Sequence, residues 1–219
     1  MTGTAEPRIR WLPPEAAAEQ EDPYAAPVTH QSRGMLRETV EHPEAPGAWD
    51  GLVREYDRQA EAWDAWVATI PQYLAALAVA LDSLPRAREA LEVGCGTGNA
   101  TRLVAAHADA VVATDVSAEM IGRAPDVERV VFAQADVRAL PFADGRFDLV
   151  VGLNAVPYGP ELARVCAQDG AIAWATSFGE DTPLHIRPET LCELLGPGWS
   201  GVAGKVGRGE WCVLRREQL

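Results

Sequence analysis

The most constraining feature of this sequence is a glycine-rich turn that directly follows a short apolar run. Ala90 to Val93 is apolar apart from Glu92, and Gly94-Cys-Gly-Thr-Gly98 comes next, ahead of a helical segment. Glycines at the carboxyl end of a buried strand permit a sharp turn, and they let a ligand approach main-chain N–H groups with no Cβ in the way. The turn therefore predicts a strand followed by a loop that binds a narrow, polar ligand.

Further apolar runs follow this turn and alternate with helical or turn segments. They cover residues 110–114, 130–133, 147–151 and 171–175. Nearly continuous apolar strands separated by crossovers are typical of a parallel sheet covered on both faces. Residues 200–206 and 210–215, joined across Gly207-Arg-Gly209, predict an antiparallel hairpin. The predicted fold is α/β: a Rossmann-like doubly wound, mostly parallel seven-stranded sheet with a C-terminal antiparallel hairpin, preceded by N-terminal helices.

Two helices are predicted ahead of the sheet. Residues 49–66 place Leu52, Tyr56, Gln59, Trp63 and Trp66 on one stripe, which indicates an amphipathic helix. Residues 71–81 are apolar almost all round, with Pro71 favouring the first turn. Connecting helices are expected over residues 100–107, 117–123 and 161–168, and residues 177–199 are expected to form a short link.

The first 47 residues differ from the rest in composition. They hold 7 of the 16 prolines and show no sustained helical or strand period. Residues 1–47 are therefore predicted to be a proline-rich arm, and residues 48–219 the functional domain. Two alternatives stay open for the arm: plain disorder, or a lid that folds over a binding site through anchors such as Trp11, Met35 and Leu36.

Charge and apolar patterning limit the partners. Against 19 basic residues stand 32 acidic ones, a formal net charge of -13, which repels a nucleic-acid backbone or an anionic membrane. The longest apolar run, Leu74 to Leu81, is far shorter than a membrane span, and no secretory signal is visible. Cys95, Cys166, Cys192 and Cys212 lack the spacing of a zinc site. We expect a cytoplasmic protein with reduced, mostly buried thiols, no metal, and no nucleic-acid or membrane partner.

The glycine spacing narrows the ligand further. The chain has G-x-G-x-G, without the third glycine of the dinucleotide pattern and without the Gly-Lys-Ser/Thr of a Walker loop. The Glu92 carboxylate would repel a pyrophosphate but would attract an ammonium or sulfonium group. Asp115 and Asp136 end the next two predicted strands, where carboxylates can accept hydrogen bonds from a nucleoside. The pattern favours a cationic nucleoside.

Four sequence blocks together resemble a known family. They are Tyr56–Asp64, Leu91–Gly98, Thr114–Ile121 and Ala135–Val150, in this order and with family-like spacing. Over residues 52–176 the chain is similar to the class I S-adenosylmethionine-dependent methyltransferases, in the small-molecule group that includes the ubiquinone and menaquinone methyltransferases.

The resemblance implies S-adenosylmethionine as cofactor and a role for each matching residue. The methionine part would be held by Glu92, Gly94, Gly96 and Thr97, with Cys95 as a small residue in the same loop and Gly98 allowing close approach. Asp115 would take the ribose hydroxyls, and Val116 and Met120 would flank the adenine. The amino edge of the adenine would meet Asp136 and Val137. Asn154 would lie under the sulfonium, and Tyr56, with Trp63, would close the N-terminal side.

The acceptor side departs from the family, because only residues 154–160 separate the fourth strand from the next helix and no cap domain is inserted. The expected pocket is open, or roofed by residues 1–50 or by the second subunit of a homodimer. The expected reaction is O-, N- or C-methylation of a small molecule. If the acceptor is a phenol or alcohol, His185 is the first candidate base and Tyr158 the second, with surface and rim positions as the alternatives.

Two other functions compete with methyl transfer. A protein of this fold can bind the cofactor without transferring a methyl group, as a cyclase-like catalyst or a regulatory binding module. A NAD-dependent dehydrogenase is disfavoured by the glycine spacing and by the lack of Tyr-x-x-x-Lys, since the single lysine, Lys205, lies in the terminal hairpin.

Overall fold

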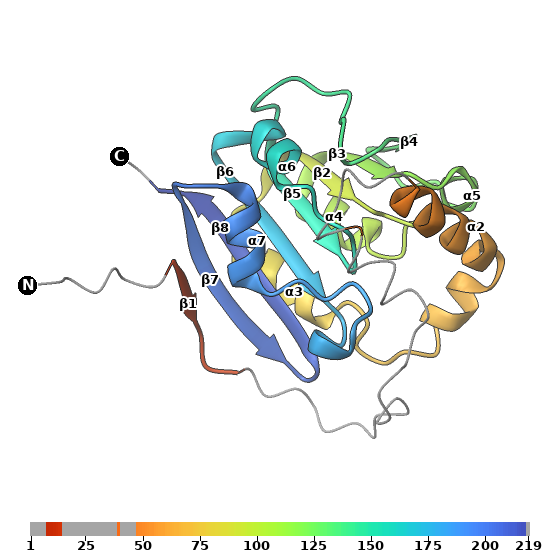
Figure 1. Cartoon of the computed structure of the whole chain (residues 1–219), viewed down its shortest axis with the longest axis horizontal. Coiled ribbons are helices and arrows are strands. Elements are labelled where there is room, and N and C mark those ends of the chain that lie inside the picture. Colours follow the sequence, from red (N-terminus) through yellow and green to blue (C-terminus); the bar gives the residue numbers. More distant parts are fainter. Residues whose placement is uncertain (1–7, 15–38, 40–46, 218–219) are drawn as a thin grey trace, which may run out of the picture.

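An eight-stranded sheet forms the centre of the protein (Figure 1). The computed structural model describes residues 8–14, 39 and 47–217. From edge to edge the strand order is β1-β7-β8-β6-β5-β2-β3-β4. Strand β8 is antiparallel to both β6 and β7, and the other neighbours are parallel. The strands are β1 (Ile9–Trp11), β2 (Ala87–Val93), β3 (Ala108–Asp115), β4 (Val130–Gln134), β5 (Phe147–Leu153), β6 (Cys166–Thr176), β7 (Trp199–Val206) and β8 (Gly209–Arg216).

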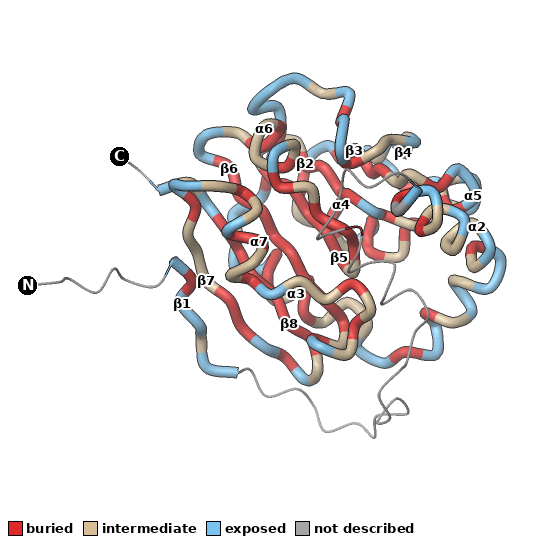
Figure 2. Tube along the Cα trace, viewed as in Figure 1, coloured by how far each residue is buried: buried red, intermediate tan, exposed pale blue. Residues whose placement is uncertain are grey.

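Helices cover both faces of this sheet, as a doubly wound fold requires. They are α2 (Ala48–Val67), α3 (Ala75–Asp82), α4 (Thr101–Ala106), α5 (Ala118–Ile121), α6 (Gly159–Val165) and α7 (Pro188–Leu195), with a short 3₁₀ helix, η1 (Gly179–Asp181). One apolar core joins α2, α6 and α7 to the sheet, and a second joins α3 and α4 to the opposite face. The buried residues follow the strands through the middle of the molecule (Figure 2). The predicted α/β class is confirmed.

Alternating side chains on β6 show why the two faces differ. Ile172 and Trp174 point into the core with α6 and α7, whereas Ala171, Ala173 and Ala175 point into the core with α3. Successive residues of a strand face opposite sides of a sheet. Because α3 is itself rich in alanine, small side chains meet small side chains, and this helix can lie close to the sheet.

The sheet has one strand more than the sequence predicted. Ile9–Trp11 pairs in parallel with β7, in register with Gly201 to Ala203. Three residues are too few to show a strand period, and the pairing is fixed by tertiary contacts. The Arg8 side chain donates hydrogen bonds to the carbonyls of Trp199 and Gly196, at 2.9 and 2.5 Å. The rest of the predicted arm, including Met35 and Leu36, lies outside the described residues.

Most of the remaining differences between the predicted and the observed secondary structure lie at helix boundaries. The helix predicted over residues 71–81 begins at Ala75, because residues 71–74 form a turn in which Gln72 has a φ of 61°. The helix predicted over residues 161–168 ends at Val165, where β6 begins. The link predicted over residues 177–199 contains η1 and α7. Pro188 at the start of α7 and its buried Leu191, Cys192 and Leu195 are the helix signal that the prediction missed.

All four cysteines are buried and free, as predicted. Within the part of the chain that the structure describes, no helix combines the length and apolar character needed to cross a membrane.

Candidate functional site

A cavity opens at the point where the strand order reverses. The chain passes from β2 outward through β3 to β4 in one direction, and through β5 to β6 in the other. Ligands of open α/β sheets bind beyond the carboxyl ends of the strands at such a reversal. Here the cavity measures about 890 Å³ including its open mouth, and its walls include the ends of β2, β3 and β5 together with α2. Its lining is largely apolar and aromatic with a few polar groups, as is typical of small-molecule sites.

The glycine loop after β2 forms the floor of this cavity. Gly94 and Gly96 have φ values of 67° and 55°, in the left-handed region that favours glycine. A Cβ on Gly94 would lie 2.7 Å from the Cβ of Ala155, which follows β5. The loop therefore depends on glycine at residue 94 for both its backbone angle and its close approach to the neighbouring strand end.

Asp115, at the end of β3, fixes the loop from the side. Its Oδ2 accepts a hydrogen bond from the Gly96 N–H at 2.8 Å, and its Oδ1 accepts one from the Ser117 N–H at 2.9 Å. Burial raises the pKa of Asp115, although these amides oppose the shift. Each carboxylate oxygen can accept a second bond, so Asp115 can hold two ligand hydroxyls while it holds the loop.

Glu92, at the end of β2, is the most unusual group in the cavity. Its side chain is only 2% exposed, and its Oε2 has no hydrogen-bond partner among the described residues. Burial, reinforced by the charge of Asp115, raises the pKa of Glu92 to about 8. A buried carboxylate without a cation is costly, so this site is suited to a ligand that brings positive charge.

The raised pKa of Glu92 makes the stability of the ligand-free protein depend on pH. Between its ordinary pKa of 4.5 and about 8, the folded chain holds a proton that the unfolded chain has lost. The free energy of unfolding should therefore fall as the pH rises through this window, by roughly 2–5 kcal/mol. Urea denaturation at pH 5 and pH 8 measures the change.

Glu92→Gln should remove most of this pH dependence, because the amide stays neutral throughout. The exposed Glu119 on α5 offers the matched control, and Glu119→Gln should keep the wild-type decline. An unchanged decline in Glu92→Gln would show that another group is responsible.

Helix α2 covers the cavity and is tied to the loops beneath it. The Asp64 carboxylate accepts hydrogen bonds from the Thr97 hydroxyl and from Asn99 Nδ2, the latter at 2.9 Å. About two helical turns earlier on α2, the Asp57 carboxylate accepts a hydrogen bond from the Ser117 hydroxyl. The roof that the sequence assigned to residues 1–50 or a second subunit is thus supplied, in the described part of the chain, largely by α2.

Most of the predicted cofactor residues meet in this cavity. Ten of them line it: Tyr56, Glu92, Gly94, Cys95, Gly96, Asp115, Val116, Met120, Val137 and Asn154. Trp63 lines it too. Burial raises the pKa of the Cys95 thiol, so this residue is not a ready thiolate.

Thr97 and Gly98 face away from the cavity. Thr97 holds α2, as described above, instead of lining the floor. A Cβ on Gly98 would lie 3.2 Å from the Phe132 ring, so this glycine serves the packing of the loop against β4.

Asp136 lies at the rim and binds a residue of its own loop. Its carboxylate forms an ion pair with Arg138, with Oδ2 at 2.6 Å from Nη2, and Arg138 in turn lies over the Trp49 ring at 4.6 Å. Arg138 is thus the main group that opposes burial of Asp136 and lowers its pKa. Ala135 and Val137 line the cavity on this side.

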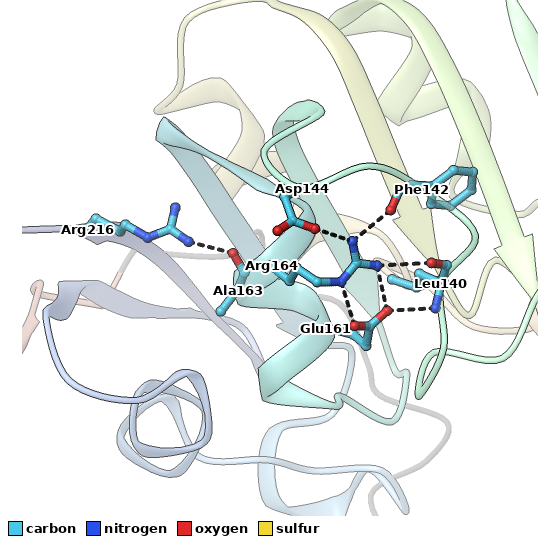
Figure 3. A network of polar contacts seen from close by, with 7 residues as sticks. All are labelled: Leu140, Phe142, Asp144, Glu161, Ala163, Arg164 and Arg216. Carbon is cyan, nitrogen blue, oxygen red and sulfur yellow. Dashed lines mark hydrogen bonds and ion pairs between the residues drawn. The ribbon is translucent and has the colours of Figure 1, made fainter.

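The loop that carries these residues is held by one arginine of α6 (Figure 3). Arg164 donates hydrogen bonds to the carbonyls of Phe142 and Leu140 at 2.7 and 3.0 Å, and to the carboxylates of Asp144 and Glu161. Glu161 also accepts the Leu140 N–H at 2.7 Å. The five donors of a guanidinium are well suited to such a clamp.

The two candidate bases do not line the cavity. His185 Nε2 lies 2.9 Å from Oε1 of Glu210, which stands near the start of β8. Both side chains are largely buried. Tyr158 precedes α6 and packs against the core on that face of the sheet. The neighbouring Leu184 reaches the cavity instead of His185.

Several lining residues were not predicted. Tyr73 belonged to the helix predicted over residues 71–81, Leu184 was given no role, and Trp49 was the first residue of the predicted amphipathic helix. Ala155 and Val156 continue the chain after Asn154. Their position directly after the fourth predicted strand was the available signal, because strand ends of a parallel sheet share one edge.

Comparison with known proteins identifies the family. A methyltransferase domain model matches residues 90–170. Malonyl-[acyl-carrier protein] O-methyltransferase of Pseudescherichia vulneris is 31% identical over 173 residues, which cover 68% of this chain and 68% of that protein. The chain belongs to the class I S-adenosylmethionine-dependent methyltransferases. The family resemblance seen in the sequence is confirmed.

Other methyltransferases match over shorter stretches. The 2-methyl-6-phytyl-1,4-hydroquinone methyltransferase of Synechocystis is 32% identical over 55% of this chain, and the match covers 42% of that protein. The chain thus spans about two fifths of the length of this relative. The solved structure "DhpI-SAM-HEP complex" has a TM-score of 0.62 at 23% identity, over 78% of this chain and 99% of that one, and shows the same fold.

The cavity of this methyltransferase fits the cofactor of its family. The orphaned carboxylate oxygen of Glu92 suits the ammonium group of S-adenosylmethionine. Asp115 has acceptor capacity left for ribose hydroxyls, and the glycine loop that it holds lines the same cavity. Apolar walls at Val116, Met120 and Val137 suit an adenine ring.

Proposed function

We propose that this chain transfers the methyl group of S-adenosylmethionine to a small-molecule acceptor. The observation that carries the proposal is the pairing of Glu92 and Asp115 on two sides of the glycine loop, within one cavity at the strand-order reversal. Relatives named for 2-methyl-6-phytyl-1,4-hydroquinone and for malonyl-[acyl-carrier protein] support a small acceptor group.

The residues take the following roles in this proposal. Glu92 binds the ammonium group, Asp115 binds the ribose hydroxyls, and Val116, Met120 and Val137 enclose the adenine. Asn154 lies under the sulfonium: its side chain is fixed by two hydrogen bonds with Ser177, both of 2.8 Å. A φ of 51° directs the Asn154 backbone out of β5 toward the cavity. Asp136 with Arg138 marks the rim at the adenine end.

When bound, S-adenosylmethionine would supply an electrophilic methyl group for the acceptor atom, and S-adenosylhomocysteine would be the other product. A proton displaced from the acceptor passes to water. The chain itself contributes alignment and exclusion of solvent, which are the main requirements of such a transfer. The aromatic side chains of α2 supply that exclusion.

Methyl-labelled cofactor tests the proposal directly. The purified chain is incubated with it and a panel of phenols, hydroquinones, amines and carboxylates. S-adenosylhomocysteine should appear in equal amount with a labelled product. Acceptor conversion without S-adenosylhomocysteine would indicate a cyclase-like catalyst, and cofactor binding without turnover of any acceptor would indicate a binding module.

His185→Ala tests the first candidate base. Because its Nε2 is engaged by Glu210 and the ring does not line the cavity, we expect turnover to stay within about tenfold of wild type. Glu210→Gln provides the partner variant. A loss of ~100-fold in His185→Ala, with unchanged cofactor affinity, would identify His185 as a base after all. Tyr158→Phe tests the second candidate in the same assay.

The surroundings of the enzyme are part of the proposal. A net charge of -13 supports a protein that does not bind nucleic acid or anionic membranes, and we assign it to the cytoplasm. Residues 1–47 are proposed as an arm outside the catalytic domain, with β1 paired to β7, residues 48–219 as the catalytic domain, and the active form as a homodimer. Truncation before residue 48 and sedimentation of the purified protein test these assignments.

A further inference from the structure

A second cavity adjoins the first. It measures about 500 Å³ including its open mouth, and it shares with the cofactor cavity the lining residues Tyr56, Trp63, Tyr73, Asn154 and Leu184. Trp66 and Phe178 line the second cavity but are not among the described residues that line the first. The five shared residues form the boundary between the two cavities, which we call the neck, and Asn154, which the proposed function places under the sulfonium, belongs to it.

This neck is rigidly built. Asn154 donates from Nδ2 to the Ser177 hydroxyl and accepts the Ser177 N–H, and the same hydroxyl donates to the Tyr73 carbonyl at 2.7 Å. One serine therefore joins the strand end to the turn that carries Tyr73. A molecule in the second cavity would therefore meet the first across a boundary whose Asn154 side chain and Tyr73 main chain are held in place.

The walls of the second cavity are aromatic. Ring centroids lie 5.7 Å apart for Tyr56 and Trp63, 5.1 Å for Trp63 and Trp66, and 6.5 Å for Trp66 and Tyr73. Phe178 lies in the loop opposite. Trp63, Trp66 and Tyr73 are only partly buried in this ligand-free structure, so they present ring surface that another flat ring can cover.

Charge is nearly absent from these walls. Asp181 is the one charged side chain among the described lining residues, and it is ion-paired with Arg208 at 2.8 Å. The same Arg208 guanidinium lies over the Phe178 ring at 5.4 Å. An acidic acceptor would thus meet a cation, and a cationic acceptor a carboxylate, that are already paired with each other. Burial raises the pKa of Tyr73 to about 12, so its hydroxyl stays protonated at neutral pH and adds no charge.

We propose that this second cavity is the acceptor pocket and that it takes a planar, uncharged aromatic molecule, whose nucleophilic atom reaches the neck beside Tyr73 and Asn154. The inference rests on the proposed function, because the neck has meaning only if the cofactor occupies the first cavity.

Three naphthalene probes of the same shape test the charge preference. They are 2-naphthol, which is neutral, 2-naphthoate, an anion, and 2-naphthylmethylammonium, a cation. Each is titrated calorimetrically into the full chain saturated with S-adenosylhomocysteine, so that no turnover occurs. The neutral probe should bind at least tenfold more tightly than either charged one. Equal or tighter binding of a charged probe would overturn the proposal.

Variants of Trp66 test whether 2-naphthol binds in the second cavity. Trp66→Leu should weaken 2-naphthol at least tenfold and leave S-adenosylhomocysteine binding unchanged, while Trp66→Phe, which keeps a ring, should recover most of the affinity. Trp11→Leu is the matched control, because Trp11 lies on β1 at the far edge of the sheet. Unchanged naphthol binding in Trp66→Leu would refute the assignment.

The two hypotheses fail in distinguishable ways. A chain that does not bind S-adenosylhomocysteine contradicts the proposed function. A chain that binds it, but binds 2-naphthol no better than the charged probes or independently of Trp66, contradicts the acceptor pocket alone.

Discussion

Asp115→Ala should lower the affinity for both S-adenosylmethionine and S-adenosylhomocysteine at least 100-fold. The substitution removes two charge-assisted acceptors for the ribose, and each is worth about 1.5–3 kcal/mol. It also releases the N–H groups of Gly96 and Ser117, which loosens the loop that forms the floor. Isothermal titration calorimetry of the two ligands measures the loss.

The control for this variant lies on the same strand. Asp109 belongs to β3 as well, but at the opposite end of the sheet, where it pairs with Arg86 at 2.7 Å. Asp109→Ala should bind both ligands as the wild type does. Asp115→Asn should fall between the two, since it keeps one acceptor. Full affinity in Asp115→Ala would place the cofactor elsewhere.

Gly94→Val should both destabilise the protein and prevent cofactor binding. The side chain would impose a β-branched residue on a φ of 67°, and its Cβ would overlap Ala155 Cβ at 2.7 Å. Backbone strain and overpacking together should lower the free energy of unfolding by roughly 2–6 kcal/mol. Urea denaturation gives the first effect, and calorimetry with S-adenosylhomocysteine gives the second.

Gly47 allows the two causes to be separated. It also has a positive φ, 83°, but a Cβ there would meet no atom within 4 Å. Gly47→Val should therefore suffer only the backbone strain and should retain cofactor affinity. If Gly94→Val and Gly47→Val lowered the free energy of unfolding equally, and both kept wild-type affinity for S-adenosylhomocysteine, the contact between residue 94 and Ala155 would have no importance.

Local pattern was sufficient to predict the sheet and the floor of the site. The apolar runs marked seven strands, and the glycine spacing placed the loop after β2. Glu92 and Asp115 were found because parallel strands end at one edge, so their distance from the turn fixed their place in space. These predictions depended on periodicity and on residues close to one another in the sequence.

The parts that local pattern does not reveal are side-chain contacts and pairings between segments. The cofactor roles of Thr97 and Asp136 stay predictions, and the structure adds that the Thr97 hydroxyl donates to Asp64, 33 residues earlier. It also adds the ion pair between Asp136 and Arg138. β1 exists because β7 is beside it, and Tyr73 meets Trp66 across a turn that no period reveals. Side-chain pairing of this kind is decided by tertiary structure, which one sequence does not display.

The arginine clamp of Figure 3 has a consequence for how this enzyme can change over time. Arg164 holds the chain at Leu140 and Phe142 through main-chain carbonyls, which every amino acid possesses. Mutations at these two positions leave the grip intact, whereas mutation of Arg164 or Glu161 releases the whole segment. Selection can thus vary the side chains of this segment, which follows the rim residue Asp136, while two residues on α6 keep its backbone in place.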